Sequence, residues 1–578
     1  MAETRILAYQ LTDYLEKLGV DIVFGLCGHT NIAFIDALHK SKIRFIITRH
    51  EQIAAHMADG YARVTGKPGV LLTHLGPGLT NAATGVANAA LDGVPMVVIA
   101  GDIPAHYFGR HPHQEINLHM DADQFEIYRP FCKRIWRVER PGEFPRVIER
   151  AFYTAQSGKP GAVLVDVPMD VFSADLPEGA FDQFPPAHLS KPGLDEKTAH
   201  QIALALIEAE KPVIYVGGGI IRDKATPELI ALAEHLDIPV THSLMGKGAI
   251  PDTHPLRAGM TGFWGTPMVI ELCKTADLVL AVGTRLAEAD NSSWDRRFTF
   301  NVPPAKLIQV EIDPNELGRN FPTDIGAVSD SKSALRSILD AAKQIRPEGL
   351  HRERLRQTIR AGIDGFAKQW ANQRVSDQFP LRPERILADV RQTLPEDGLI
   401  VTDVGWNKNG VGQQFDITSP GTFITPGAFA TMGFGPAAAL GAKVGAPDKT
   451  VLALIGDGAF SSNMAVVATA VEANIPVTWL VMDNLAHGTI ALLKEHHYDS
   501  DFGCVFTCNG QPYSIDYAAV ARACGAEGIT IEQADQLAPA LEKAFASNVP
   551  SLIHARMENV PTPTPGHWNI NDIYRAGL

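Results

Sequence analysis

The sequence predicts an α/β protein of three domains, each built on a parallel sheet flanked by helices. The chain has 578 residues, which is too long for one hydrophobic core. Apolar, β-branched runs recur along it, each ending in glycine or a polar residue and alternating with stretches of helical periodicity. Apolar residues make up 45% of the chain and charged residues 20%, a composition typical of globular proteins.

The first predicted domain covers residues 1–185. It begins with an amphipathic helical pattern in residues 1–19, which lacks the basic segment and apolar core of a secretion signal. Residues 66–101 contain a strand, a glycine turn, a helix of small residues and a second buried strand. The Pro-rich stretch 175–193 predicts a linker at the end of this domain.

A central α/β domain is predicted for residues 194–345 and a third domain for residues 380–560, with a charged helical connector at 351–370. The third domain contains the apolar runs LIVTDVG, TVLALIGDG and PVTWLVMDN, which end in Gly, Asp or Asn. Ligands of open parallel sheets bind beyond the carboxyl ends of strands, so a site is expected there. The tail, residues 561–578, is Pro-rich and then aromatic, which indicates a linker and a docking segment. A lid over the active site is our hypothesis for it.

The charge balance excludes several classes of partner. The chain has 51 Lys and Arg against 65 Asp and Glu, a net charge of −14, whereas nucleic acids and anionic membranes need clustered positive charge. No apolar run approaches the roughly 20 residues that span a bilayer. Six scattered cysteines do not indicate a disulfide framework. We expect a cytoplasmic protein without nucleic acid or membrane partners.

Two polar residues at strand ends predict a magnesium site. Asp457, in the segment GDGAF, follows one apolar run, and Asn484 follows the next, 27 residues later. One helix and one strand account for this separation, so both side chains are expected at one edge of the sheet. Carboxylate and amide oxygens suit Mg²⁺, and the glycines allow backbone amides to approach a diphosphate.

With this motif the chain resembles the thiamine diphosphate-dependent enzymes of the acetolactate synthase and pyruvate oxidase group. The resemblance extends over essentially the whole chain, and it implies pyrimidine-binding, central and diphosphate-binding domains in that order. It also implies thiamine diphosphate and Mg²⁺ as cofactors. The matching segments are RHEQIAAHMADGYAR, GPGLTNAATGVANA, PHQE, IDPNELGRN, TDVG, FATMGFGPAAALGA and GDGAF.

The resemblance assigns roles to particular residues. Glu51 matches the glutamate that activates the cofactor by hydrogen bonding to its aminopyrimidine ring. Met432 matches the bulky apolar residue that holds the cofactor in a V shape, and the carbonyl of Ala430 matches the acceptor of its amino group. In this family the pyrimidine-binding domain of one subunit meets the diphosphate-binding domain of another. A homodimer or homotetramer with a shared active site is therefore implied.

The same resemblance gives the residues around the metal and the diphosphate. The side chains of Asp457 and Asn484 and the carbonyl of Ala486 are the implied metal ligands. The other implied cofactor-binding residues are Gly405, Asn407, Gly456, Gly458, Ala459 and Gly488.

Four further residues are expected near the reacting carbonyl substrate. Gln114 matches the glutamine beside the reacting carbon in acetolactate synthases, but His113 precedes it where a phenylalanine is usual, and Leu493 stands where a tryptophan selects the second 2-oxo acid. His29 and His74 replace small residues in loops that face the thiazolium ring, where imidazoles can relay protons. The GHT segment resembles a cyclohexane-1,2-dione hydrolase of the same superfamily.

The implied function is a carbon–carbon bond lyase or carboligase acting on a 2-oxo acid or 2-hydroxy ketone, as in acetolactate synthase. Three alternatives stay open: a flavin-dependent oxidoreductase of the pyruvate oxidase type, a cyclic 1,2-dione hydrolase and a 2-hydroxyacyl-CoA lyase. Relatives use the central domain for FAD, for ADP or for neither. The glycine turn at 217–219 is weak evidence by itself, so FAD is left open.

Overall fold

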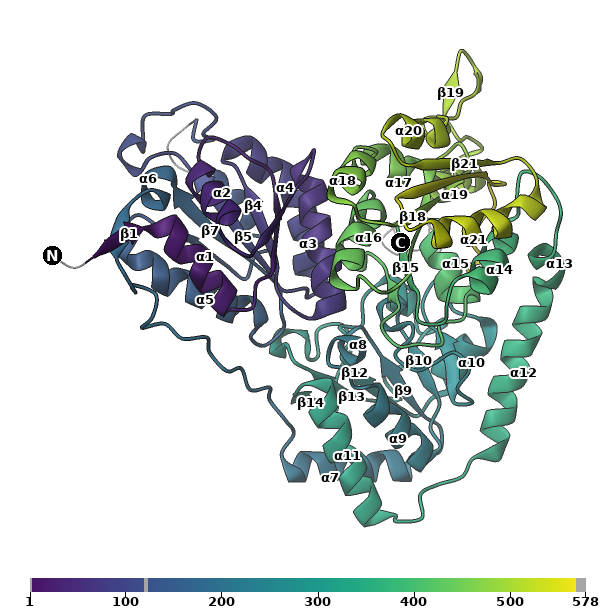
Figure 1. The fold of residues 1–578 in the computed structure, drawn as a ribbon. Helices are drawn as coiled ribbons and strands as arrows, with labels where there is room; N and C mark the ends of the chain where they lie inside the picture. Colours follow the sequence, from purple (N-terminus) through teal and green to yellow (C-terminus); the bar gives the residue numbers. More distant parts are fainter. Residues whose placement is uncertain (1–2, 119–122, 568–578) are drawn as a thin grey trace.

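The structure is a computed structural model that describes residues 3–118 and 123–567 (Figure 1). It contains three six-stranded sheets, and all pairings within each of them are parallel. Helices flank each sheet, so the predicted fold class is confirmed. No helix in the described ranges is both long enough and apolar enough to cross a membrane. The six cysteines are all free.

The first sheet is buried on both faces, as its apolar strands predict. In β4 (Gly69–Thr73), Leu71 packs in the core on one side, while Val70 and Leu72 pack in the core on the other. The strand order is β3 (Arg44–Ile47), β2 (Ile22–Gly25), β4 (Gly69–Thr73), β5 (Met96–Asp102), β7 (Ala162–Pro168) and β6 (Arg134–Arg137). The helices are α1 (Leu7–Lys17), α2 (Ile32–His39), α3 (Glu51–Thr65), α4 (Gly76–Leu91), α5 (Phe144–Gln156) and α6 (Met169–Phe172), and β1 (Thr4–Ile6) pairs with β8 (Asp175–Pro177).

The central sheet has its own hydrophobic cores on its two faces. Its strand order is β11 (Arg257–Met260), β10 (Val240–His242), β9 (Pro212–Val216), β12 (Leu278–Val282), β13 (Lys306–Glu311) and β14 (Ile325–Val328). Its helices are α7 (Glu196–Glu208), α8 (Gly219–Arg222), α9 (Thr226–Leu236), α10 (Pro267–Thr275) and α11 (Ser331–Ile345). The connector to the third sheet is helical, as predicted, and comprises α12 (Glu353–Gln369) and α13 (Ala371–Arg374).

The third sheet brings the predicted site strands β17 and β18 side by side. Its order is β16 (Phe423–Ile424), β15 (Leu399–Thr402), β17 (Val451–Gly456), β18 (Thr478–Asp483), β22 (Ser551–Arg556) and β21 (Glu527–Ile531). Its helices are α14 (Pro383–Thr393), α15 (Trp406–Gln414), α16 (Phe434–Gly445), α17 (Asp457–Ser462), α18 (Val466–Ala473), α19 (Gly488–Tyr498), α20 (Tyr517–Ala523) and α21 (Leu537–Ser547), and β19 (Thr507–Cys508) pairs with β20 (Gln511–Pro512). Of the tail, residues 568–578 lie outside the described ranges, so the lid hypothesis concerns residues that cannot be placed here.

The first and third domains of one chain pack through α3 and α16 (Figure 1). Glycines let the two helix backbones approach closely. A Cβ atom on Gly441 would lie 1.8 Å from the carbonyl oxygen of Met57, and one on Gly60 would lie 2.1 Å from that of Ala438. This contact fixes the position of the beginning of α3, where Glu51 lies, relative to the third domain.

A buried ion network reinforces the same junction. Arg63 donates to Asp59 at 2.5 Å and to Asp92 at 2.8 Å. Asp92 in turn accepts the backbone N–H groups of Gly427 and Ala428, both at 2.8 Å, from the third domain. Buried charges are tolerated when they are paired and hydrogen-bonded in this way.

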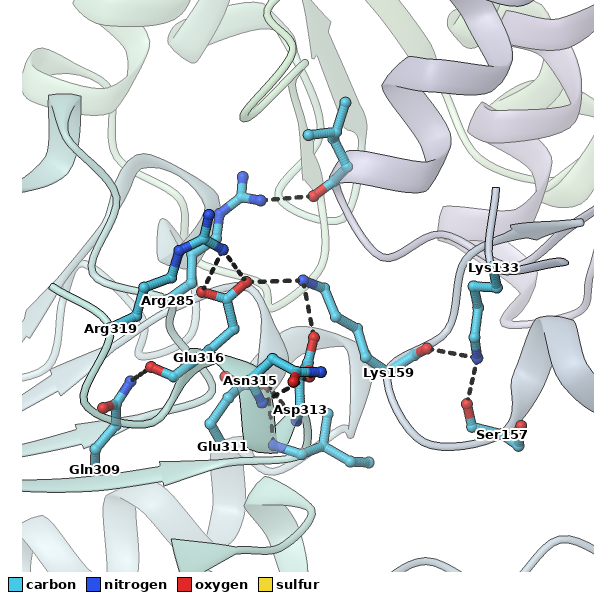
Figure 2. A network of polar contacts seen from close by, with 12 residues as sticks. Lys133, Ser157, Lys159, Arg285, Gln309, Glu311, Asp313, Asn315, Glu316 and Arg319 are labelled. Carbon is cyan, nitrogen blue, oxygen red and sulfur yellow. Dashed lines mark hydrogen bonds and ion pairs between the residues drawn. The ribbon is translucent and has the colours of Figure 1, made fainter. Parts of the chain in front are cut away.

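Figure 2 shows the contact between the first and central domains. The ammonium group of Lys159 lies 3.4 Å from Glu316 Oε1 and 3.6 Å from Asp313 Oδ2. Lys133 Nζ donates to the backbone carbonyls of Ser157 and Lys159 at 2.6 and 2.8 Å, which orders the loop that carries Lys159. Burial lowers the pKa of Lys133 to about 8.

Candidate active site

The strand ends predicted to hold a metal bring three oxygen atoms together. Asn484 Oδ1 lies 3.0 Å from the carbonyl oxygen of Ala486 and 3.2 Å from Asp457 Oδ1. The Asn484 nitrogen donates to Asn559 Oδ1 at 3.0 Å, which keeps the oxygen turned toward Asp457. Rotating the amide would place its nitrogen among these acceptors but would turn its oxygen against Asn559 Oδ1. A cation among the three oxygens satisfies every group at once.

The pKa of Asp457 and its unpaired oxygen also fit a site that binds a cation. Burial and the neighbouring Asp483 carboxylate raise the pKa of Asp457, and its Oδ2 atom is buried without a hydrogen-bond partner in the structure. Although burial opposes it, hydrogen bonds, first of all from His554 at 2.9 Å, lower the pKa of Asp483. In the described residues no group of three or more His, Cys, Asp or Glu forms a metal site. The candidate donors are instead one carboxylate, one amide and one carbonyl, a set of hard ligands that suits Mg²⁺.

Next to these oxygens is a cavity of about 1080 Å³ with room for a phosphate-bearing cofactor. The glycines in its wall leave space that side chains would fill. A Cβ atom on Gly458 would lie 2.8 Å from His487 Nδ1, and one on Gly488 would lie 2.1 Å from Asn484 Nδ2. The predicted cofactor-binding residues line this cavity: Gly405, Asn407, Ala430, Met432, Gly456, Asp457, Gly458, Ala459, Asn484 and Gly488.

Asn407 is already engaged by its own loop. Its Oδ1 atom accepts the backbone N–H of Asp403 at 2.9 Å, and its Nδ2 atom donates to the carbonyl of Val404 at 3.2 Å. The side chain therefore shapes the turn at Gly405, which has a φ of +113°. Contact with a diphosphate through its amide would require these bonds to be shared or broken.

Asp403 supports the wall of the cavity without lining it, and the sequence analysis does not single it out. This buried carboxylate accepts the backbone N–H groups of Val404 and Gly435, both at 2.7 Å, and of Gly433 at 3.3 Å. Burial raises its pKa to about 6. It thereby fixes the segment that carries Met432 against the end of β15. In the sequence this residue is the Asp of TDVG, a segment that ends a predicted strand and matches the family without a role for the Asp.

The predicted catalytic glutamate lies at the start of α3 in the first domain. Glu51 is 6% exposed, and its Oε2 atom accepts a hydrogen bond from Asn81 of α4 at 2.9 Å. Glu51 and His74 both lie beside Gly78. A Cβ atom placed on this glycine would lie 3.4 Å from Glu51 Oε1 and 3.2 Å from His74 Cβ. Asn81 was not singled out in the sequence, since its partner lies 30 residues away.

The other four predicted catalytic residues gather around His74. His74 Nε2 lies 2.9 Å from Gln114 Oε1. The His29 ring meets the His74 ring edge-on with centroids 4.6 Å apart, and His113 lies 6.4 Å from His29. Burial, with a further contribution from His29, lowers the pKa of His74. His74 is buried, whereas His29, His113 and Gln114 are exposed.

The two halves of the site are not joined within one chain. The cavity beside Asp457 and Asn484 is lined by residues of all three domains, but among the described residues Glu51, His74 and Gln114 do not line it. The α3 residues that line it, Ala62, Arg63 and Val64, belong to the opposite end of the helix. A single chain thus presents a diphosphate half and a separate half with Glu51.

The cavity continues into the central domain. Its wall there includes the turn at 217–219, Arg285 and Glu311. Glu311 follows the pattern of an acidic residue at a strand end that binds ribose hydroxyls, and burial raises its pKa. The glycine turn also has a packing role, because a Cβ atom on Gly217 would lie 2.3 Å from the carbonyl oxygen of Gly283.

Comparison with known proteins identifies the family. Three models of the thiamine pyrophosphate enzyme family match the chain: the N-terminal TPP binding domain at residues 6–127, the central domain at 199–338 and the C-terminal TPP binding domain at 403–555. The chain belongs to this family, so the resemblance seen in the sequence is confirmed and the protein is an enzyme that uses thiamine diphosphate.

The similar curated proteins belong to one branch of this enzyme family. The chain is 35% identical to the probable acetolactate synthase large subunit of Methanocaldococcus jannaschii over 570 residues, which cover 96% of this chain and 92% of that protein. It is 35% identical to the acetolactate synthase large subunit of Corynebacterium glutamicum over 580 residues, covering 98% and 89%. The corresponding protein of Haemophilus influenzae is 32% identical over 551 residues, covering 93% and 92%.

Proposed function

We propose that this protein is a thiamine diphosphate- and Mg²⁺-dependent carboligase that forms or cleaves a carbon–carbon bond beside the carbonyl of a 2-oxo acid or 2-hydroxy ketone. The observation that carries the proposal is the convergence of oxygens from Asp457, Asn484 and Ala486 at the edge of a glycine-lined cavity. The names of the similar proteins, acetolactate synthase large subunit, support a carboligase with 2-oxo acid substrates.

The residues around the cavity have distinct tasks in this proposal. Asp457, Asn484 and Ala486 would hold Mg²⁺, and the backbone at Gly458 and Gly488 would face the diphosphate. When bound, thiamine diphosphate supplies a carbanion that attacks a carbonyl carbon and then stabilises the negative charge left by cleavage. Met432 and Ala430, which has a φ of +49°, would position the ring system.

Glu51 and the groups around His74 would move and hold protons. The Glu51 carboxyl, oriented by Asn81, would hold a proton against the aminopyrimidine nitrogen and so promote deprotonation of the reactive carbon. Gln114, held in place by the neutral His74, would contact the oxygen of the substrate carbonyl. His29 and His113, both exposed in the single chain, would face the acceptor.

Two copies of the chain would complete each site in this proposal, as a homodimer or a homotetramer. The support is that Glu51 does not line the cavity of its own chain, while apolar side chains are exposed near both halves. Exposed apolar surface of this kind marks an interface. These residues, with their exposed fractions, are Ile32 (60%), Ile116 (41%), Leu118 (74%), Phe429 (44%) and Ile490 (50%).

A substrate panel tests the proposal. The purified enzyme with thiamine diphosphate and Mg²⁺ is expected to consume pyruvate, alone or with a second 2-oxo acid, and to release carbon dioxide with a 2-alkyl-2-hydroxy-3-oxo acid as product. Mass spectrometry and chiral chromatography identify the products. If the enzyme cleaved only cyclic 1,2-diones or 2-hydroxyacyl-CoA thioesters, carboligation of 2-oxo acids would be wrong.

An oxidase with bound flavin is the second function to be separated from carboligation, although the similar proteins named above are acetolactate synthases. Glu311 at a strand end and the nearby glycine turn fit an adenine nucleotide. The same preparation separates the two functions. Flavin released by heat, together with pyruvate-dependent bleaching and oxygen uptake, would favour the oxidase, whereas carboligation without oxygen uptake supports our proposal.

A further inference from the structure

We propose that Thr30 is a positioning residue that holds His74, so that His74 presents the side-chain amide of Gln114 to the oxygen of the reacting carbonyl. The inference rests on the proposed function and assigns tasks within the same site. The three residues come from separate segments: Thr30 just before α2, His74 just after β4, and Gln114 in the loop that follows β5.

The hydrogen bonds determine which nitrogen of His74 carries the proton. Nε2 lies 2.9 Å from Gln114 Oε1, an oxygen that only accepts, so Nε2 donates. A neutral imidazole has one proton, which leaves Nδ1 to accept the hydroxyl of Thr30 at 2.7 Å. Burial, with His29 and His113 nearby, lowers the pKa of His74, although the hydrogen bond with Gln114 and the Glu51 carboxylate oppose this shift. His74 is therefore neutral at pH 7.

This arrangement leaves one end of Gln114 for the substrate. Its Oε1 atom is turned toward His74, so its Nε2 group points away from that ring, and Gln114 as a whole is exposed. No partner for Nε2 appears among the described residues. The backbone is held as well. Gln114 has a φ of +67°, and its carbonyl oxygen would lie 2.0 Å from a Cβ atom on Gly76. Neither the backbone nor the side chain is free to turn the amide away.

Thr30 and His74 are themselves confined by close packing. Thr30 is 1% exposed, and a Cβ atom on Gly101 would lie 2.5 Å from its hydroxyl oxygen. A Cβ atom on Gly28 would lie 2.3 Å from Cγ of the His74 ring. The chain of contacts thus runs from a fixed buried hydroxyl, through a fixed ring, to an exposed amide. A hydrogen-bond donor oriented before the substrate arrives loses no energy to reorganisation during the reaction.

The test uses Thr30→Val, which keeps the shape of the side chain and removes the hydroxyl, and Thr30→Ser, which restores it. We expect Thr30→Val to lower kcat about tenfold or more with KM and thiamine diphosphate affinity little changed, and Thr30→Ser to recover most of the loss. Thr12→Val is the matched control, because Thr12 is a buried threonine of the same domain whose hydroxyl, within the described part of the chain, bonds only the carbonyl of Tyr9. It is expected to leave kcat unchanged.

A double-mutant cycle with Gln114→Leu separates positioning from general damage. If Thr30 acts through Gln114, then Thr30→Val has no further effect on kcat in the Gln114→Leu background. Independent, multiplicative losses would overturn the inference, as would a Thr30→Val enzyme with wild-type kcat. If the Thr30→Val protein does not fold, the Thr30→Ser protein decides the test. It must then fold and have a kcat within about threefold of wild type. A wild-type enzyme that binds the cofactor but converts no carbonyl substrate would instead contradict the proposed function.

Discussion

Replacing Glu51 with Gln is expected to lower kcat by about 10²- to 10⁴-fold while leaving thiamine diphosphate bound, because the change removes only the acidic proton of a buried carboxyl. The Gln side chain has the same shape and keeps an oxygen to accept from Asn81, so α3 should begin as it does in the wild type. Steady-state kinetics with saturating cofactor measure the loss. Exchange of the reactive carbon proton of the bound cofactor, followed by NMR after quenching, should slow in parallel.

Glu384→Gln is the matched control for this variant. Glu384 is 2% exposed and also lies in the first turn of a helix, α14, but it pairs with Arg382 and lines no part of the cavity in the described chain. Any activity it loses reflects stability alone. A Glu51→Gln enzyme with wild-type kcat would refute the role of this carboxyl in activating the cofactor.

Replacing Asp457 with Asn is expected to abolish cofactor retention, because it removes the only carboxylate among the three candidate metal ligands. At a cofactor concentration of 100 Kd, binding stabilises the folded state by about 2.7 kcal/mol. The rise in Tm on adding thiamine diphosphate and Mg²⁺ should therefore disappear in the variant. Differential scanning calorimetry with and without the cofactors measures it.

The cofactor-free Asp457→Asn protein should be at least as stable as the cofactor-free wild type at pH 7. Because the pKa of Asp457 is raised in the folded protein, the folded protein keeps a proton on this carboxyl above about pH 4, where the unfolded chain has released it. The carboxyl therefore stabilises the folded state in acid, and this stabilisation is lost as the pH rises. Asn has no proton to lose, so the variant does not lose this stabilisation as the pH rises to 7. Asp397→Asn, at an exposed carboxylate of the same domain, is the control and should retain the full cofactor-induced shift. A normal shift in the Asp457→Asn protein would contradict the metal site.

Much of this architecture could be predicted from local sequence patterns. The strands that end at Asp457 and Asn484 carry continuous apolar runs, and parallel pairing puts their ends at one edge whatever the details of packing. The glutamate at Glu51 could be placed because the segment around it resembles the family over many consecutive residues. These features depend on neighbours in the sequence or on the regular geometry of a sheet.

The remaining site residues depend on contacts between distant segments. Thr30 meets His74 across 44 positions, and Asp403 meets Gly435 across 32. Nothing in the residues beside Thr30 or Asp403 indicates those partners, because a threonine just before a helix and an aspartate at a strand end are both ordinary. For Asn407 the resemblance implies contact with the cofactor. In the structure the Asn407 side chain lines the cavity, but its amide is hydrogen-bonded to the backbone of its own turn.

Complementation between two inactive variants tests the central claim most directly, namely that each active site combines Glu51 of one chain with Asp457 of another. Glu51→Gln and Asp457→Asn chains carrying different tags are co-expressed, and assemblies with both tags are purified. In a mixed dimer with shared sites, one site receives both defects and the other receives none, so about half of the wild-type kcat per dimer should return. If each chain built its own site, every site would carry one defect, and mixed dimers no more active than either parent would contradict the account.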